Sequence, residues 1–122
     1  MTKQHSILIV DDEQGVCDLL TRLFEREGYV VEHTTDSLKA ADLVKSLKPN
    51  CLLLDVIMPK IAGVEVLASV RLVHPEIKVI MITGHGNLET AMESMKLGAY
   101  DYVTKPFDLA FIKELVARAV KE

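Results

Sequence analysis

The chain has 122 residues, a length that suits one domain (1–122) with a single hydrophobic core. Its 49% hydrophobic content is typical of a globular protein, and the formal net charge of −4 argues against direct binding of nucleic acid. No apolar run approaches the roughly 20 residues that cross a bilayer, and the amino terminus lacks a signal-peptide pattern. We therefore expect a soluble, cytoplasmic domain without a membrane partner.

Short apolar strands alternate with amphipathic helices along the chain. Strands are predicted at residues 7–10, 29–35, 51–55, 77–82 and 100–103. Helices are predicted from residue 16 to a stop at Gly28, from a cap at Asp36 or Ser37 to Pro49, over 64–73, over 88–97 after a cap at Asn87, and after a cap at Asp108. Helical spacing predicts that the inward-facing residues are Val16, Leu19, Leu20, Leu23 and Phe24, then Ala40, Leu43, Val44 and Leu47, then Val66, Leu67 and Val70, and finally Ile112, Leu115, Val116 and Ala119.

This alternation, with short connections, predicts an α/β fold built from right-handed βαβ crossovers. Five strands suit a parallel sheet of order 2-1-3-4-5, doubly wound by five helices as in the flavodoxin-like folds. The two cysteines, Cys17 and Cys51, fall in a predicted helix and a predicted strand. We expect both to be small buried apolar residues, with neither a disulfide nor a metal site.

The central strand of this sheet ends in a carboxylate. Residues 51–54 are all apolar, as in a strand that is buried on both faces, and Asp55 follows directly. An unpaired charge inside such a strand costs several kcal/mol, so Asp55 is expected at the carboxyl end, where open parallel sheets place their ligand chemistry. Taken alone, Asp55 suits an ordinary turn-capping role equally well.

Polar side chains also follow the other strands that open on this edge of the sheet. Asp11 and Asp12 follow the first strand, Thr83 ends the fourth, and Lys105 lies just past the fifth. Converging carboxylates repel one another, and a hard divalent cation with oxygen ligands, Mg²⁺ in a cell, offsets that repulsion. Capping of the following helix is the alternative role for Asp11 and Asp12.

This group of side chains suits phosphoryl transfer. A carboxylate beside Mg²⁺ can attack a phosphoryl group and form an acyl phosphate. The Lys105 ammonium and the Thr83 hydroxyl would then bind phosphoryl oxygens that the metal does not. The Lys105–Pro106 bond is a candidate cis peptide, which would direct the lysine back into the site.

At these spacings the motifs resemble, from end to end of the chain, the receiver domain of two-component response regulators. The residues that carry the resemblance are Asp11-Asp12, Asp55-Val-Ile-Met58-Pro59 with Gly63, Thr83, and Gly98-Ala-Tyr-Asp-Tyr-Val-Thr-Lys105-Pro106-Phe107. The loop at 83–86 and the stretch at 98–102 look most like receivers of bacterial enhancer-binding transcription activators, which precede an ATPase and a DNA-binding module.

The resemblance implies a regulatory phosphoacceptor that takes a phosphoryl group from a sensor histidine kinase, and not an enzyme with an external substrate. It implies Asp55 as the phosphoacceptor. Asp12, Asp55 and the backbone carbonyl of Val56 are the implied Mg²⁺ ligands, with Asp11 assisting chiefly through water. An effector domain in the same full-length chain and a role in transcription are expected on the same grounds.

The resemblance also implies how the output surface changes. Thr83 and Tyr102 match the family's switch pair, in which the hydroxyl moves onto the phosphoryl group and the aromatic ring turns inward. The output surface is expected on the helix at 88–97, the strand at 100–103 and the last helix. A phosphorylation-dependent homodimer through this surface could use ion pairs and apolar contacts, with core packing as the alternative role of the apolar members. The residues concerned are Met92, Met95, Lys96, Asp101, Phe111 and Arg118.

One position separates this chain from its nearest enzymatic alternative, a haloacid-dehalogenase-type aspartyl-phosphate phosphatase. That chemistry needs a second acid two residues after the nucleophile, where this chain has Ile57. Because Ile57 offers attacking water no partner, we also expect slow self-dephosphorylation. A flavodoxin-like binder of flavin phosphate is a further alternative, but the acidic residues 11–13 would repel that phosphate.

Overall fold

The predicted sheet is present, with all five strands parallel and in the order β2-β1-β3-β4-β5. The structure is a computed structural model that describes residues 4–58, 60, 62–84 and 88–122. The strands are β1 (Ser6–Val10), β2 (Val30–Thr34), β3 (Cys51–Asp55), β4 (Lys78–Thr83) and β5 (Asp101–Thr104). Leu54 of β3 pairs with Val10 on one side and with Met81 on the other, so β3 lies inside the sheet.

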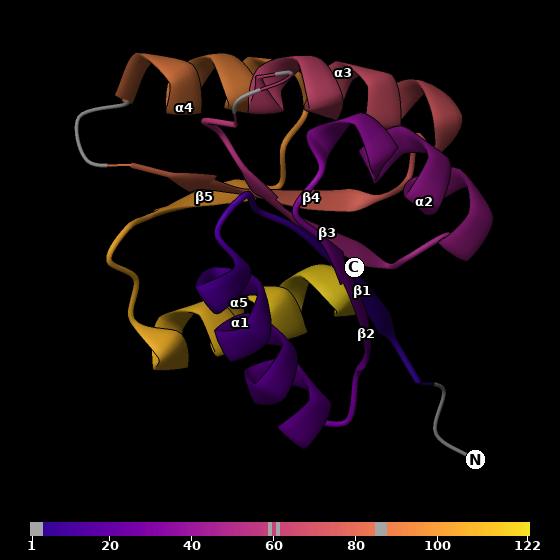
Figure 1. Cartoon of the computed structure of the whole chain (residues 1–122), viewed down its shortest axis with the longest axis vertical. Coiled ribbons are helices and arrows are strands. Elements are labelled where there is room, and N and C mark those ends of the chain that lie inside the picture. The colour runs from indigo at the N-terminus through magenta and orange to yellow at the C-terminus, as the bar shows by residue number, and fades with distance from the viewer. Residues whose placement is uncertain (1–3, 59, 61, 85–87) are drawn as a thin grey trace.

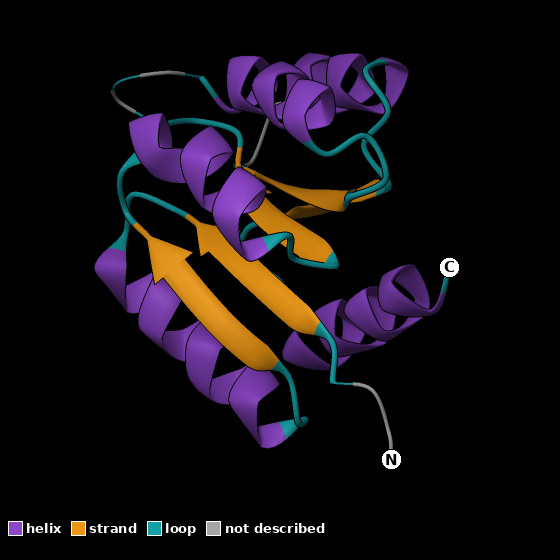
Figure 2. Ribbon diagram, turned by 90° about the vertical axis from the view of Figure 1, so that its right-hand side faces the viewer, coloured by secondary structure: helices purple, strands orange, loops and turns teal. Residues whose placement is uncertain are grey.

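Helices cover both faces of the sheet. They are α1 (Gln14–Arg26), α2 (Ala40–Leu47), α3 (Gly63–Val73), α4 (Leu88–Lys96) and α5 (Leu109–Lys121), with a short 3₁₀ helix, η1 (Ser37–Lys39), before α2. Figure 1 shows α2, α3 and α4 above the sheet and α1 and α5 below it, and Figure 2 shows the same layers from the side. Within the described residues no helix is both long and apolar enough to cross a membrane.

The apolar run of β3 is explained by two cores that meet at this strand. Leu52 and Leu54 belong to the core under α2 and α3, whereas Cys51 and Leu53 belong to the core under α1 and α5. Every residue of β3, Asp55 included, is buried. Burial on both faces is therefore why the sequence shows no alternation here. Both cysteines are buried free thiols, as expected.

Two residues assigned to inner helix faces are instead largely exposed. Leu19 is 45% exposed because Cys17, three residues before the buried Leu20, takes the inward position on α1. Leu47 is 42% exposed at the last residue of α2, where the chain turns away through a left-handed Lys48 (φ 48°). The predicted inner residues of α3 and α5 are all buried, as expected: Val66, Leu67, Val70, Ile112, Leu115, Val116 and Ala119.

Several predicted ends differ from the observed ones by one or two residues. Helix α1 begins at Gln14, two residues earlier than expected. The Asp36 side chain accepts a hydrogen bond from the Leu38 N–H (3.0 Å), so it caps η1 and not α2 directly. Asp108 caps α5 as expected, accepting from the Ala110 N–H at 2.8 Å. The expected cap at position 87 lies outside the described residues.

Candidate functional site

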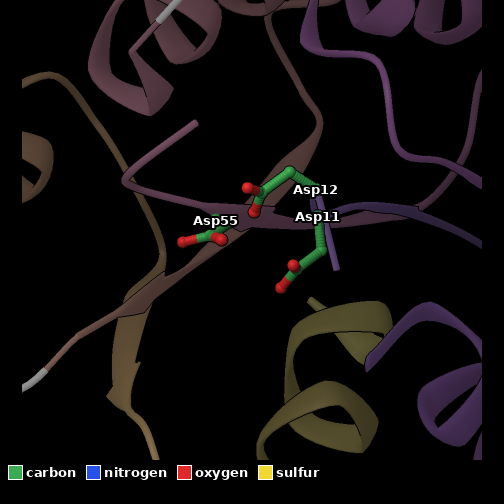
Figure 3. A group of neighbouring side chains, drawn as sticks. All are labelled: Asp11, Asp12 and Asp55. Atoms are coloured by element: carbon green, nitrogen blue, oxygen red, sulfur yellow. The ribbon is translucent and has the colours of Figure 1, made fainter. Parts of the chain in front are cut away.

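Three carboxylates meet at the carboxyl edge of the sheet. Asp11 and Asp12 follow β1, and Asp55 is the last residue of β3 (Figure 3). One oxygen of each lies within 4.8 Å of the others, and Asp11 and Asp55 are buried whereas Asp12 is exposed. Backbone N–H groups hold the two buried ones: Glu13 donates to Asp11 Oδ1 (2.9 Å) and Ile57 to Asp55 Oδ1 (3.2 Å). The predicted convergence is therefore present.

Lys105 closes this group from the loop after β5. Its ammonium lies 3.2 Å from Asp11 Oδ2 and 3.4 Å from Asp55 Oδ2. Its backbone N–H donates to the Thr83 carbonyl (2.8 Å), which holds the loop against the end of β4. The Lys105–Pro106 peptide bond is cis, as the sequence suggested.

The charged groups in this site change one another's pKa. Burial, together with the nearby charge of Asp11, raises the pKa of Asp55 to about 7. Burial also raises the pKa of Asp11, although the Glu13 N–H and the Lys105 charge oppose that change. Burial lowers the pKa of Lys105, but the hydrogen bond that its ammonium donates to Glu13 and the charges of Asp11 and Asp55 outweigh this effect, so the net pKa is raised. The site therefore holds more negative charge than one lysine can neutralise.

The residues present fit a divalent cation. Asp11 Oδ2 is buried and has no hydrogen-bond partner among the described residues, although it lies close to the Lys105 ammonium. That ammonium is shared with Glu13 and Asp55, so it does not neutralise this buried oxygen by itself, and hard cations such as Mg²⁺ prefer oxygen ligands of this kind. The implied fourth ligand, the Val56 carbonyl, already accepts a hydrogen bond from the Gly63 N–H (2.8 Å), which leaves it one lone pair.

The implied switch residues lie on neighbouring strands. Thr83 is buried at the end of β4, and its hydroxyl donates to the Val103 carbonyl (3.3 Å) and not to Asp55. Tyr102 on β5 is half-buried and packs against the core under α2 and α3. In the register of these strands Tyr102 pairs with Met81 and Thr83 with Thr104, so the two residues are offset by two positions on adjacent strands. His85 and Gly86 of the loop that follows lie outside the described residues, as does Pro59.

Two contacts in the site were not anticipated from the sequence. Glu13 Oε1 lies 3.0 Å from the Lys105 ammonium, which makes it a third carboxylate on this lysine. The position of Glu13 directly after the two aspartates was the feature of the sequence that could have predicted this contact. The Cys17 thiol donates to the Asp11 carbonyl (3.3 Å), and burial raises the pKa of this thiol to about 11, so it stays protonated at neutral pH.

A close approach of backbone supports the loop after Asp55. A Cβ added at Gly63 would lie 2.7 Å from the Val56 Cα, a separation that Cβ atoms essentially never show. Glycine is therefore required where the start of α3 packs against the backbone that follows β3. Ile57, two residues after Asp55, is 60% exposed at the mouth of the site.

Comparison with known proteins gives the same class as the fold and the site. The family described as response regulator receiver domain matches residues 7–117. Sporulation initiation phosphotransferase F of Bacillus subtilis is 38% identical over 92% of this chain and 90% of that protein. The nitrogen assimilation regulatory protein NtrX of Azorhizobium caulinodans is also 38% identical, over 96% of this chain but only 26% of that protein.

Solved structures agree with this assignment. The receiver domain of NtrX from Brucella abortus has a TM-score of 0.89 at 33% identity, covering 94% of this chain and 98% of that one. A CheY-like receiver domain from Methanospirillum hungatei has a TM-score of 0.93 at 29% identity, covering 98% and 95%. The fold and the acidic edge thus define a doubly wound α/β signalling domain. The chain belongs to the receiver domains of two-component response regulators.

This membership decides between the functions that the sequence left open. The domain is a receiver in two-component signalling and not a phosphatase of the haloacid-dehalogenase type. Receivers are phosphoacceptors and not enzymes that act on an external substrate. A histidine kinase is the partner that this class implies.

Proposed function

We propose that Asp55 accepts the phosphoryl group in this receiver, with Mg²⁺ held by the carboxylates of Asp11, Asp12 and Asp55. The observation that carries the proposal is the buried Asp55 carboxylate, which lies 3.4 Å from the Lys105 ammonium and has an oxygen within 4.8 Å of one oxygen from each of the two other aspartates. This arrangement supplies a nucleophile and a cation beside it. The Val56 carbonyl stays a predicted additional ligand, given its hydrogen bond to Gly63.

The chain's own residues account for most of the transfer step. One Asp55 oxygen attacks the phosphorus of a phosphohistidine, the P–N bond breaks, and its electron pair leaves with the imidazole nitrogen. Lys105 binds a non-bridging oxygen of the transferred group, and the Ile57 N–H keeps the carboxylate oriented. Bound Mg²⁺ would supply further charge neutralisation at the phosphoryl oxygens.

The proposed switch follows from the present direction of the Thr83 hydroxyl. A phosphoryl oxygen on Asp55 is a stronger acceptor than the Val103 carbonyl that Thr83 now contacts at 3.3 Å. Rotation of the hydroxyl onto that oxygen vacates space beside β5, into which the half-buried Tyr102 ring turns. The phosphoryl group then stabilises one of two conformations through contacts that differ between them.

The partners of the whole protein form part of the same proposal. A sensor histidine kinase donates the phosphoryl group in the cytoplasm, and the output is control of transcription through an effector domain of a longer chain. The full-length bacterial regulators among its relatives support this: the chain spans about a quarter of NtrX and of AtoC from Escherichia coli.

We further propose that α4, β5 and α5 form a dimer surface in the phosphorylated state. Three large apolar side chains are exposed on this surface and are therefore not part of the core: Met92 (54%), Met95 (40%) and Phe111 (45%). Asp101 has no ion-pair partner within the described part of the chain, and it is therefore available to a second subunit.

Replacing Asp101 by Lys is expected to weaken dimerisation after phosphorylation, because it places like charges across the symmetric contact. Exposed ion pairs contribute about 0.2–1 kcal/mol each, so the loss of affinity should be several-fold for two symmetric pairs. Sedimentation velocity with and without acetyl phosphate measures the dimer affinity. The matched control is Asp42→Lys, at an exposed position of α2. An unaltered dimer in Asp101→Lys would contradict the assignment of this surface.

Replacing Ile57 by Asn is expected to shorten the lifetime of the phosphoryl group by roughly tenfold. An amide at this exposed position can hydrogen-bond the attacking water, and one such bond is worth about 1.4 kcal/mol in the transition state. The decay of the adduct after removal of the donor gives the lifetime. Leu72→Asn makes the same change on α3 at an 84% exposed position and should leave it unchanged. An equal or longer lifetime in Ile57→Asn would refute the role assigned to Ile57.

Incubation with acetyl phosphate and Mg²⁺, followed by intact mass measurement, tests the proposed function. We expect the mass to increase by one phosphoryl group, and we expect a chelator to prevent the increase. No adduct under any donor concentration would refute the assignment of a phosphoacceptor.

A further inference from the structure

One carboxylate on Lys105 has no part in the reaction proposed above. Glu13 Oε1 lies 3.0 Å from the Lys105 ammonium, nearer than Asp11 Oδ2 (3.2 Å) or Asp55 Oδ2 (3.4 Å). The oxygens that converge as a cation site belong to the three aspartates and not to Glu13. Glu13 therefore contacts the lysine without being the nucleophile or a proposed metal ligand.

The backbone of Glu13 is fixed, but its side chain is free to turn. Its N–H donates to Asp11 Oδ1 (2.9 Å), and its carbonyl accepts from the Cys17 N–H (3.2 Å) at the start of α1. The side chain itself is 63% exposed. The Glu13 carboxylate can therefore leave the lysine and be solvated by water, which a buried carboxylate cannot do.

The three partners of Lys105 differ in how easily a phosphoryl oxygen replaces them. An ammonium has three N–H donors, and three carboxylates surround it here. Asp55 carries the incoming group, and the Asp11 side chain is fully buried, so its release would leave a buried charge unpaired. Glu13 is the partner that can be exchanged at the lowest free-energy cost.

We propose that Glu13 is a positioning residue that holds Lys105 in the unphosphorylated state and competes with the phosphoryl group for it. The proposal rests on Asp55 as the phosphoacceptor. Removing the Glu13 charge makes the lysine more available to the phosphoryl group by about two- to fivefold, the value of a partly exposed ion pair. Glu13 thereby limits phosphorylation from weak donors.

The test compares Glu13→Gln with the unsubstituted protein at saturating Mg²⁺. We expect the second-order rate constant for phosphorylation by acetyl phosphate to rise about two- to fivefold. Beryllofluoride, a non-covalent mimic of the phosphoryl group, should bind more tightly by a similar factor in ¹⁹F NMR titrations. Both ratios should approach one near 1 M salt, where the Debye length is about 3 Å.

Two further variants separate this role from a general effect of charge. Glu25→Gln removes the same charge from an exposed position of α1 and should leave both constants unchanged. Glu13→Asp keeps the charge and should stay nearer to the unsubstituted protein than Glu13→Gln does.

The outcomes distinguish this proposal from the one on which it rests. An adduct that forms in Glu13→Gln no faster than in Glu25→Gln, or a gain that persists at high salt, would overturn the role of Glu13 alone. Absence of both adduct and beryllofluoride binding in the unsubstituted protein would overturn the phosphoacceptor assignment together with it.

Discussion

Replacing Asp55 by Asn is expected to abolish the phosphoryl adduct completely. The amide oxygen is a poor nucleophile, and the other carboxylates near Lys105 are not expected to replace Asp55, since Glu13 is 63% exposed and lies outside the group of converging aspartates. Asp11 Oδ2 is fully buried, and Asp12 is not among the ion-pair partners of the lysine within the described residues. Intact mass after incubation with acetyl phosphate and Mg²⁺ measures the result.

The matched control is Asp42→Asn, which makes the same chemical change on the exposed side of α2. This variant should form the adduct at the same rate as the unsubstituted protein. A stable adduct in Asp55→Asn would show that another residue is the nucleophile, with Asp11 and Asp12 the first to test.

Without metal, Asp55→Asn should stabilise the protein at neutral and higher pH. Burial and the charge of Asp11 raise the folded-state pKa of Asp55 to about 7, whereas its ordinary value is 3.8. The folded state therefore binds more protons than the unfolded state between these values, so the contribution of Asp55 to stability is present at low pH. It is lost as the pH rises through about 7, where the ionised carboxylate is left in a buried, negative site.

At pH 8 in a chelator, Asp55→Asn is expected to raise the free energy of unfolding by about 2 kcal/mol. This corresponds to a rise in Tm of roughly 5–10 °C, and the difference should shrink at pH 5. Added Mg²⁺ should stabilise the unsubstituted protein at pH 8 and should have a weaker effect on Asp55→Asn, because the metal binds the folded state through these carboxylates.

Thermal and urea denaturation at pH 5 and pH 8, with Mg²⁺ or a chelator, measure these effects. Relative to the unsubstituted protein, Asp42→Asn should show neither a pH-dependent gain in stability nor a weaker response to Mg²⁺. A metal-free Asp55→Asn protein that is less stable than the unsubstituted protein at pH 8 would contradict the account of charge repulsion in the site.

The position of the site could be predicted from the sequence because parallel topology leaves little freedom. Once the strands alternate with helices in the order 2-1-3-4-5, residues after β1, β3, β4 and β5 must open on the same edge. Asp11, Asp55, Thr83 and Lys105 therefore meet whatever the details of packing. The continuous apolar run before Asp55 likewise required burial on both faces, which the two cores provide.

What could not be predicted depends on side-chain rotamers and on local competition. The contact from Glu13 to Lys105 requires one of several nearby carboxylates to reach the ammonium, and spacing does not decide which one. The direction of the Thr83 hydroxyl depends on a single torsion. Leu19 lies next to Cys17 and Leu20 on α1, and only packing decided which of these residues faces the sheet.

The position of the acyl phosphate tests the central claim most directly. Borohydride reduces an aspartyl phosphate to homoserine, so treatment of the phosphorylated protein marks the acceptor permanently, and peptide mass spectrometry locates the mark. We predict homoserine at position 55 and at no other aspartate, and only when donor and Mg²⁺ were both present. Homoserine at position 11 or 12, or a phosphorylated protein without homoserine, would contradict the assignment of Asp55 as the nucleophile.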